Sequence, residues 1–321
     1  MYENIIVGID GHRGGRDAAA LARTLAAPGA RRTLVYVAGL VKPRGERERE
    51  LEESPAQELP ARLEIERELC GPGANVVVVR SGSVGTALRD LTADAGADLV
   101  VVGATHRHGL ARILAGDDVR DVLHECRCAL AIAPVGYHRG PHAIRRIGVA
   151  YDGGLPSQFA LEHAHGLANR LGATVTPVNV VPPRYYTAGW GVAAMPMDDP
   201  DQACAAARRR LEPSTGPDLK VLYGDTGTEL RRFSAEVDLL VCGAHHHSTA
   251  GRWLLGSTSE HLAKHAAGPL LIVPAPATVP VPASGASPTD ARAPAAGSAS
   301  PTDTADDSAS PTASRAAPVS V

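Results

Sequence analysis

Two kinds of residue in the segment 243–258 have the potential for chemistry. The segment reads GAHHHSTAGRWLLGST, so it holds three adjacent histidines and ends in a glycine followed by two hydroxyl residues. Imidazole nitrogens are common metal ligands, whereas a glycine at the start of a helix lets backbone N–H groups approach a phosphate. The segment therefore indicates a metal site, a phosphate-binding loop, or a loop and helix that bind nothing.

The histidines do not form a recognised metal-binding pattern. His261 and His265 lie four positions apart on an expected helix and would share one face. However, no glutamate follows His261 in an H-E-x-x-H arrangement, and no cysteine pair completes a tetrahedral set. Adjacent histidines such as 245–247 rarely converge on one ion. We therefore expect no bound metal.

The chain also lacks the sequence patterns of common catalytic sites. It contains no G-x-S-x-G nucleophile motif and no G-x-x-x-x-G-K-[ST] phosphate loop. No base and nucleophile stand out as a pair. We therefore expect no catalytic residues.

The segment 243–258 has a counterpart earlier in the chain. ADLVVVGATHRHGLARILAGDD (97–118) matches VDLLVCGAHHHSTAGRWLLGST (237–258), and NIIVGIDG (4–11) matches RIGVAYDG (146–153). The matches pair Gly103 with Gly243, Gly116 with Gly256, and Asp10 with Asp152. A unit of roughly 140 residues therefore occurs twice, which is typical of a duplicated domain.

The elements that must position these residues alternate between strands and helices. Short apolar runs such as IIVGI, TLVYV, VVVV, LVVV and LAIA predict strands buried on both faces, and the segments 16–27 and 47–69 have helical spacing. Such alternation favours a parallel sheet with right-handed crossovers. We predict two tandem α/β domains, each with a five-stranded parallel sheet of Rossmann-like type. Ligands of such sheets bind at the carboxyl ends of the strands.

These elements place the aspartates and glycines at the carboxyl ends of the strands in each sheet. Asp10 and Asp152 each end a first strand, and Gly103 and Gly243 each end a fourth strand and open a loop. The predicted domains are 1–138 and 143–276. The remainder, 277–321, is rich in Ala, Pro, Ser and Thr, so we expect a disordered tail.

Composition excludes several classes of partner. The chain has 321 residues and a net charge of −3, without a long basic block, so we expect no nucleic acid partner. No apolar run approaches the roughly 18 residues of a membrane span, so no membrane association is expected. The five cysteines show no framework spacing, and the chain enters a strand-like run at once. A cytoplasmic location with reduced thiols is the expectation.

These motifs resemble the universal stress protein family in tandem form. The resemblance is carried by VGIDG and VAYDG at the first strands, by RSGSVGTAL and YGDTGTEL before the third helices, and by the two glycine loops, which follow the family pattern G-x2-G-x9-G-[ST]. It covers about residues 1–275. It implies an adenine nucleotide alpha-hydrolase-like fold, with the two domains packed as a pseudo-dimer through their final strands. A homodimer of such chains is a further option.

The resemblance also implies a ligand. Nucleotide-binding members hold ATP, with Mg²⁺, against the first-strand aspartate and a second-strand valine, and the glycine loop surrounds the phosphates. The implied positions are Asp152, Val180, Gly243, His246, Gly256, Ser257 and Thr258 in the second domain, and Asp10, Val37, Gly103 and Gly116 in the first.

Departures from the family pattern rank the two domains. The middle glycine is replaced by His106 in the first domain and by His246 in the second. The first domain also has Asp117 and Asp118 where the second has hydroxyl residues, and carboxylates repel a triphosphate unless a metal intervenes. The second domain is therefore the better candidate for ATP.

The resemblance implies stress-response signalling or persistence, with at most slow, incidental ATP hydrolysis. The alternative is a stress protein that works without nucleotide through an unknown protein partner. In that case the aspartates and glycines serve only turn geometry and helix capping.

Overall fold

The computed structural model describes residues 1–38, 59–104, 128–140, 143–186, 195–196, 198–247, 252–254 and 257–275. The predictions for the tail (277–321) and for His106, Gly116 and Gly256 lie outside these residues. Contacts join Met1–Thr278 into one compact unit. No helix within the described ranges is long and apolar enough to cross a bilayer.

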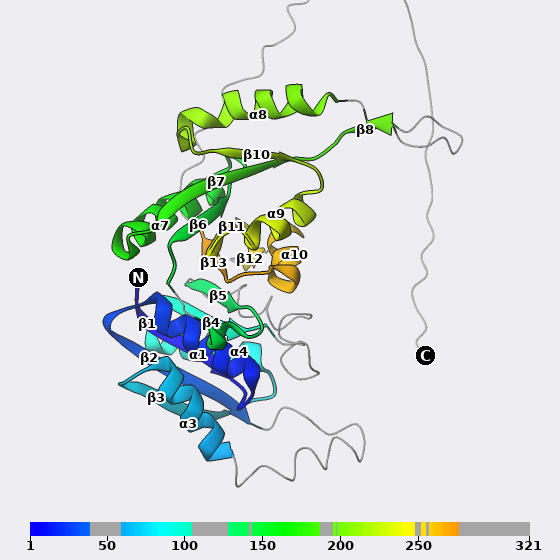
Figure 1. The fold of residues 1–321 in the computed structure, drawn as a ribbon. Coiled ribbons are helices and arrows are strands. Elements are labelled where there is room, and N and C mark those ends of the chain that lie inside the picture. The colour runs from blue at the N-terminus through cyan, green and yellow to red at the C-terminus, as the bar shows by residue number, and fades with distance from the viewer. Residues whose placement is uncertain are drawn as a thin grey trace, which may run out of the picture. The chain divides into compact units, whose positions relative to one another are not determined.

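Strands and helices alternate along the first repeat, as predicted (Figure 1). Its elements are β1 (Tyr2–Ile9), α1 (Arg13–Leu25), β2 (Ala26–Ala38), α3 (Leu59–Cys70), β3 (Ala74–Arg80), α4 (Val84–Ala95), β4 (Leu99–Gly103) and β5 (Ala129–Ala133). A short 3-10 helix, η1 (Tyr137–Arg139), lies in the linker to the second repeat.

The second repeat follows the same order. Its elements are β6 (Arg146–Ala150), α7 (Leu155–Leu171), β7 (Thr174–Val181), β8 (Tyr185–Tyr186), β9 (Met195–Pro196), α8 (Pro200–Thr215), β10 (Lys220–Tyr223), α9 (Thr226–Ser234), β11 (Leu239–His247), β12 (Arg252–Leu254), α10 (Ser257–His265) and β13 (Leu270–Pro274). The pair β8 and β9 forms a small separate sheet within this repeat.

The strands confirm two five-stranded parallel sheets joined through their final strands. The order is β10-β7-β6-β11-β13-β5-β4-β1-β2-β3, and β13 pairs with β5 antiparallel, with Leu271 opposite Ala131. Within the large sheet, neighbouring strands of each repeat pair in parallel, apart from the short β12, which pairs antiparallel with β11; β8 and β9 of the small sheet also pair antiparallel. The predicted pseudo-dimer is therefore a single continuous sheet within one chain.

The helices bury the faces that the sequence pattern indicates. Ala18, Leu21, Ala22 and Leu25 recur at helical spacing on α1 and are all fully buried. The predicted helix 16–27 begins earlier, at Arg13, and its last two residues belong to β2 instead. The helix predicted over 47–69 is described only from Leu59 onward.

Burial on both faces was predicted for every strand, and this is wrong for β3. The run VVVV lies in β3 at the end of the sheet, where it pairs only with β2. Val77 is 37% exposed and Val78 is 59% exposed. An apolar run has the same composition at the edge of a sheet as at its centre, so only the strand order reveals the difference.

Polar contacts also tie the two repeats together. Buried Asp17 of α1 accepts hydrogen bonds from the backbone N–H groups of Gly136 and His138 in the linker, both at 2.9 Å. Its carboxylate also lies 2.5 Å from His138 Nδ1. Near the start of the chain, the Tyr2 hydroxyl lies 2.7 Å from Nε2 of His163 on α7. These contacts fix the linker and the N-terminal strand.

Candidate functional site

Asp152 lies just beyond the carboxyl end of β6, and it organises the loop that leads into α7. Its Oδ1 accepts hydrogen bonds from the backbone N–H of Gly154 at 2.8 Å and from the Ser157 hydroxyl at 2.8 Å. These bonds hold the chain in a tight turn at the N-terminus of α7. For Oδ2, no hydrogen-bond donor is found among the described residues. One carboxylate oxygen therefore shapes the loop, while the other stays available to a ligand.

Gly243 and Gly103 each allow the first helix of their own repeat to approach the fourth strand closely. A Cβ on Gly243 would lie 2.3 Å from the carbonyl oxygen of Pro156 in α7, and a Cβ on Gly103 would lie 2.0 Å from that of Gly14 in α1. No side chain fits at such distances. Both glycines are therefore required by helix–strand packing, whether or not a ligand binds.

A cavity of about 250 Å³ opens beside these residues in the second repeat. It is lined by residues at the end of β6, within β7 and β11, and near the N-termini of α7, α9 and α10. Among them are Asp152, Ser157, Val180, Thr226, Gly243, Ser257 and Thr258. Five positions implied for ATP binding, Asp152, Val180, Gly243, Ser257 and Thr258, thus meet at one cavity.

Two of the implied positions, His246 and Gly256, lie partly or wholly outside the described residues. The fourth strand of the second repeat was expected to end at Gly243, but β11 continues to His247, since β12 provides it with an antiparallel partner. The backbone of His246 lies in this hairpin, opposite Trp253. The side chain of His246 and all of Gly256 lie outside the described residues. In the first repeat β4 does end at Gly103, as predicted.

Among the helix ends at the cavity, the N-terminus of α10 is the most favourable to negative charge. The N-termini of α7, α9 and α10 contribute lining residues, and a helix N-terminus carries a partial positive charge. At α9 this charge is already met by Asp225, which accepts hydrogen bonds from the backbone N–H of Thr228 at 2.9 Å and from its hydroxyl at 2.7 Å. These bonds lower the pKa of Asp225. At α10, by contrast, the first two residues are Ser257 and Thr258, which are neutral donors, and Glu260 of the same turn is paired with Lys264 at 2.9 Å.

The floor of the cavity is largely apolar. Cys242 is buried, and burial raises the pKa of its thiol to about 11, so this cysteine is a neutral packing residue. Ser259, also buried, has its hydroxyl 3.5 Å from the carbonyl oxygen of Gly243. Asn179 of β7 donates to the carbonyl oxygen of Tyr151 at 2.7 Å and so joins two strand ends.

Sequence reasoning missed several of the lining residues. Ser157 and Thr226 belong to first helical turns, and Asn179 precedes the implied Val180 by one position. Ser157 was detectable from the sequence, because a hydroxyl in the first helical turn after a strand-ending aspartate is well placed to contact that carboxylate. Thr226 lies in the motif YGDTGTEL, which carried the resemblance without giving this residue a role, and Asn179 gave no comparable signal.

The first repeat has a different arrangement around Asp10. Oδ1 of Asp10 accepts hydrogen bonds from the backbone N–H groups of His12 at 2.9 Å and Gly15 at 3.0 Å. Behind this loop lies Glu66 of α3, which is 0% exposed. A Cβ on Gly15 would lie 2.0 Å from Glu66 Oε1, so the carboxyl packs directly against the loop.

Glu66 is a buried carboxyl that was not expected. The sequence places it in a helix rich in charged residues, where a solvated position is the usual outcome. Burial, and next the charge of Asp10, raise the pKa of Glu66 to about 8. Val37 and Gly103 lie at the ends of β2 and β4 as predicted. The first repeat therefore has two carboxyl groups where the second repeat has one carboxylate and a hydroxyl.

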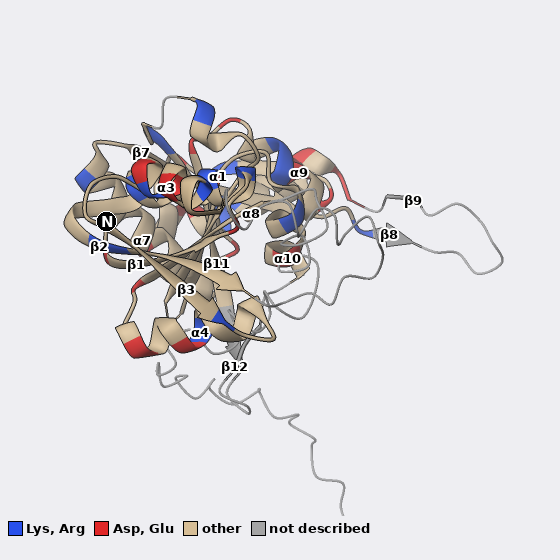
Figure 2. Ribbon diagram, turned by 90° about the horizontal axis from the view of Figure 1, so that it is seen from below, with Lys and Arg blue, Asp and Glu red and all other residues tan. Residues whose placement is uncertain are grey.

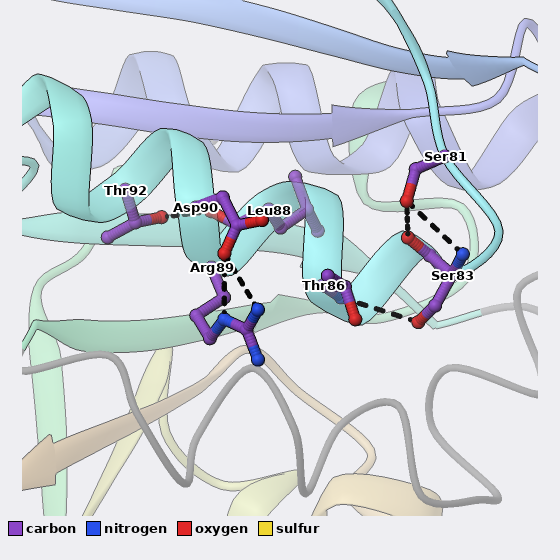
Figure 3. A network of polar contacts seen from close by, with 7 residues as sticks. All are labelled: Ser81, Ser83, Thr86, Leu88, Arg89, Asp90 and Thr92. Carbon is purple, nitrogen blue, oxygen red and sulfur yellow. Dashed lines mark hydrogen bonds and ion pairs between the residues drawn. The ribbon is translucent and has the colours of Figure 1, made fainter.

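The third helices of the two repeats also differ in their N-terminal caps. Figure 3 shows the cap of α4, where the Ser83 hydroxyl accepts a hydrogen bond from the backbone N–H of Thr86 at 3.3 Å. The Ser81 hydroxyl donates to the Ser83 carbonyl oxygen at 2.9 Å. The cap of α4 is therefore neutral, whereas that of α9 is the carboxylate of Asp225.

The two histidines of α10, His261 and His265, contact each other. The rings of His261 and His265 stack with centroids 4.5 Å apart, and His265 Nδ1 lies 2.9 Å from the carbonyl oxygen of His261. Within the described ranges, no group of three or more His, Cys, Asp or Glu side chains is arranged to hold a metal ion. The side chains of residues 245–247 lie outside those ranges.

Solved structures share this fold over most of the chain. A universal stress protein from Archaeoglobus fulgidus is 15% identical, with a TM-score of 0.51, and the match covers 85% of this chain and 96% of that one. A Pseudomonas aeruginosa protein assigned to the universal stress proteins is 16% identical, with a TM-score of 0.52, and the match covers 85% of this chain and 93% of that one. No curated protein matches the chain.

The family comparison agrees with the duplicated architecture. The model of the universal stress protein family matches the chain twice, over residues 1–134 and 143–274. The two matches fall on the two sheets that β5 and β13 join. The chain therefore belongs to the universal stress protein family and carries two copies of its domain in tandem.

Proposed function

We propose that the second domain binds ATP and that this ligand serves stress-response signalling or persistence. The observation that carries the proposal is the cavity of about 250 Å³, because five residues that the family resemblance implies, from Asp152 to Thr258, line it. Its volume is slightly below the range of about 300–1,000 Å³ that is typical of small-molecule sites.

The residues present fit an adenine nucleotide. The apolar floor around Val180 suits a base, and the free Oδ2 of Asp152 is an acceptor for an amino or hydroxyl group. The N-terminus of α10, with Ser257 and Thr258, would receive phosphate oxygens. Mg²⁺ would accompany the phosphates. The Ser157 hydroxyl that contacts Asp152 also donates to the carbonyl oxygen of Gly154 and so belongs to the turn before α7, and we propose a bound ligand rather than a turned-over substrate.

The first domain is the weaker candidate for physical reasons. Glu66 and Asp10 bring two carboxyl groups to the loop that the family uses for nucleotide. The sequence adds Asp117 and Asp118 at the positions equivalent to Ser257 and Thr258. The charge of Asp117 and Asp118 opposes an anionic ligand, whereas Glu66, with its raised pKa of about 8, is mostly neutral at pH 7 and packs against the loop.

A cytoplasmic location and an intramolecular pairing of the domains belong to the same proposal. The cysteines in the described residues, namely Cys70, Cys128, Cys204 and Cys242, are all free thiols, in agreement with a reducing compartment. The domain boundaries that we propose are 1–138 and 143–276. A protein partner that reads the nucleotide state would complete the signalling role.

One observation favours the alternative, a stress protein that works without nucleotide. Gly103 and Gly243 are already required by close helix–strand packing. One of the two carboxylate oxygens of Asp152, Oδ1, likewise accepts hydrogen bonds within its own loop. Under this alternative the motif preserves the fold, and function depends on a protein partner.

Isothermal titration with Mg-ATP separates these functions. Wild-type protein is compared with Ser257→Asp, which copies the acidic loop of the first domain into the second. Ser214→Asp is the matched control, because it adds the same charge at an exposed position of α8 away from the cavity. We expect micromolar binding that falls at least tenfold, or about 1.4 kcal/mol, in Ser257→Asp only.

Other outcomes are equally informative. Binding that survives in Ser257→Asp would move the site out of the second domain and contradict the proposal. Absence of heat, together with an unchanged melting temperature, would favour the nucleotide-independent alternative.

A further inference from the structure

We propose that the chain has a second ligand site, a groove at the junction of the two repeats that binds a small polyanion. The groove has a volume of about 970 Å³. Its walls include Arg23, Leu69, His138, Arg145, Gly172 and Thr174. The ligand class is an organic molecule with two or more phosphate or carboxylate groups.

The groove lies at the opposite edge of the sheet from the ATP cavity. Arg23 is in the last turn of α1, directly before β2 begins, and Leu69 is in the last turn of α3. Arg145 directly precedes β6, and Thr174 is the first residue of β7. All these positions are at the amino ends of strands. A ligand there would touch both repeats without entering the cavity of the second domain.

The charge of the groove is unbalanced. Arg23 and Arg145 come from different repeats, and neither guanidinium has a hydrogen-bond or ion-pair partner among the residues that the structure describes. No aspartate or glutamate is among the described lining residues. Figure 2 shows basic and acidic positions on several helices of the chain.

A third arginine adds to the positive potential. A Cβ on Gly71 would lie 3.0 Å from Arg32 Nη1 and 3.6 Å from Arg23 Nε, so both side chains approach the same glycine. Arg32 donates to the carbonyl oxygens of Cys70 and Pro72. Like charges this close favour an anion between or beside them.

Helix dipoles explain only part of this arrangement. A cation in the last turn of a helix is stabilised by the helix C-terminus, and this accounts for Arg23. Arg145 belongs to no helix, so the same reason does not apply to it. The planar guanidinium, with its fork of N–H donors, matches phosphate and carboxylate oxygens in pairs. Two such forks on facing segments suit a ligand with two anionic groups.

The walls of the groove are held in place before any ligand arrives. His138 is fixed by Asp17 through both its backbone N–H and its ring. The backbone N–H of Arg145 donates to Asp238 at 2.9 Å, and its carbonyl oxygen accepts from Thr174 N at 2.8 Å. A fixed backbone lowers the entropy that binding would cost.

Two probes test the groove and separate its ligand classes. Inorganic pyrophosphate and citrate are titrated calorimetrically into the Ser257→Asp protein, which disfavours anions at the N-terminus of α10. We expect a dissociation constant below about 1 mM for at least one probe. The double variant Arg23→Gln with Arg145→Gln should weaken it at least tenfold. The double variant Arg209→Gln with Arg210→Gln, at exposed positions of α8 that line neither cavity, is the charge-matched control.

The results divide as follows. Loss in the Arg23 and Arg145 double variant but not in the Arg209 and Arg210 double variant supports the groove, and the probe that binds identifies phosphate-bearing or carboxylate-bearing ligands. Equal binding by the Arg23 and Arg145 double variant, or no heat from either probe, overturns the proposal. Because Arg23 and Arg145 are exposed, the variants should keep the wild-type melting temperature, and this is checked first.

Discussion

At the scale of single residues, the two repeats differ most in their carboxyl groups. Asp152 shares its loop with the Ser157 hydroxyl, whereas Asp10 shares its loop with buried Glu66. A buried carboxyl in the neighbourhood of another one holds its proton more tightly than in the unfolded chain. The first repeat thus carries a group whose protonation is coupled to folding.

Glu66 predicts a dependence of stability on pH. Its folded pKa of about 8 exceeds the ordinary value of 4.5, so the folded chain binds more protons between these values. The contribution of Glu66 to stability is therefore complete below about pH 4.5 and is lost as the pH rises through 8. Glu66→Gln should remove this loss and raise the free energy of unfolding at pH 9 by about 1–3 kcal/mol relative to wild type.

Urea denaturation at pH 6 and pH 9 measures the effect. Glu68→Gln is the control, because Glu68 is exposed on the same helix. If the wild type and Glu66→Gln lost the same stability between the two pH values, Glu66 would not be the buried proton-binding group.

At the scale of elements, the decisive contacts are those between helix N-termini and strand ends. Gly243 lets α7 approach β11, and Gly103 does the same for α1 and β4. The positions of these glycines were predictable from the repeat, but their packing role was not, because sequence spacing does not reveal which backbone lies opposite. The edge exposure of β3 and the burial of Glu66 escaped prediction for the same reason. The parallel strand order was predictable, since buried apolar runs alternating with helices allow few other topologies.

Gly243 allows a direct test at this scale. In Gly243→Ala the new Cβ would meet the carbonyl oxygen of Pro156 at 2.3 Å, so α7 must move, and we expect a loss of about 2–4 kcal/mol. Gly166→Ala is the control, since it lies within α7 with no atom within 4 Å of its new Cβ. That variant should be neutral or more stable by about 1 kcal/mol. Thermal unfolding compares the two, and a Gly243→Ala protein as stable as wild type would rule out the packing role.

At the scale of the whole molecule, Asp17 connects α1 to the linker between the repeats. Its carboxylate accepts from two backbone N–H groups and contacts the ring of His138. Asp17→Asn leaves these buried donors poorly matched, so we expect a loss of about 2–4 kcal/mol. Trypsin should also cleave faster at Arg139 and Arg145. Asp94→Asn, exposed on α4, is the control, and equal cleavage of both variants would show that Asp17 does not secure the linker.

The antiparallel pairing of β5 with β13 has a consequence for how the two halves can change. In a homodimer each substitution appears on both sides of the interface, so both copies must tolerate it. Here the partners are joined covalently, and pairing is independent of protein concentration because the linker sets a high effective concentration. Each half can therefore change separately. One repeat can retain a buried carboxyl while the other retains an open cavity, and the shared sheet keeps them together.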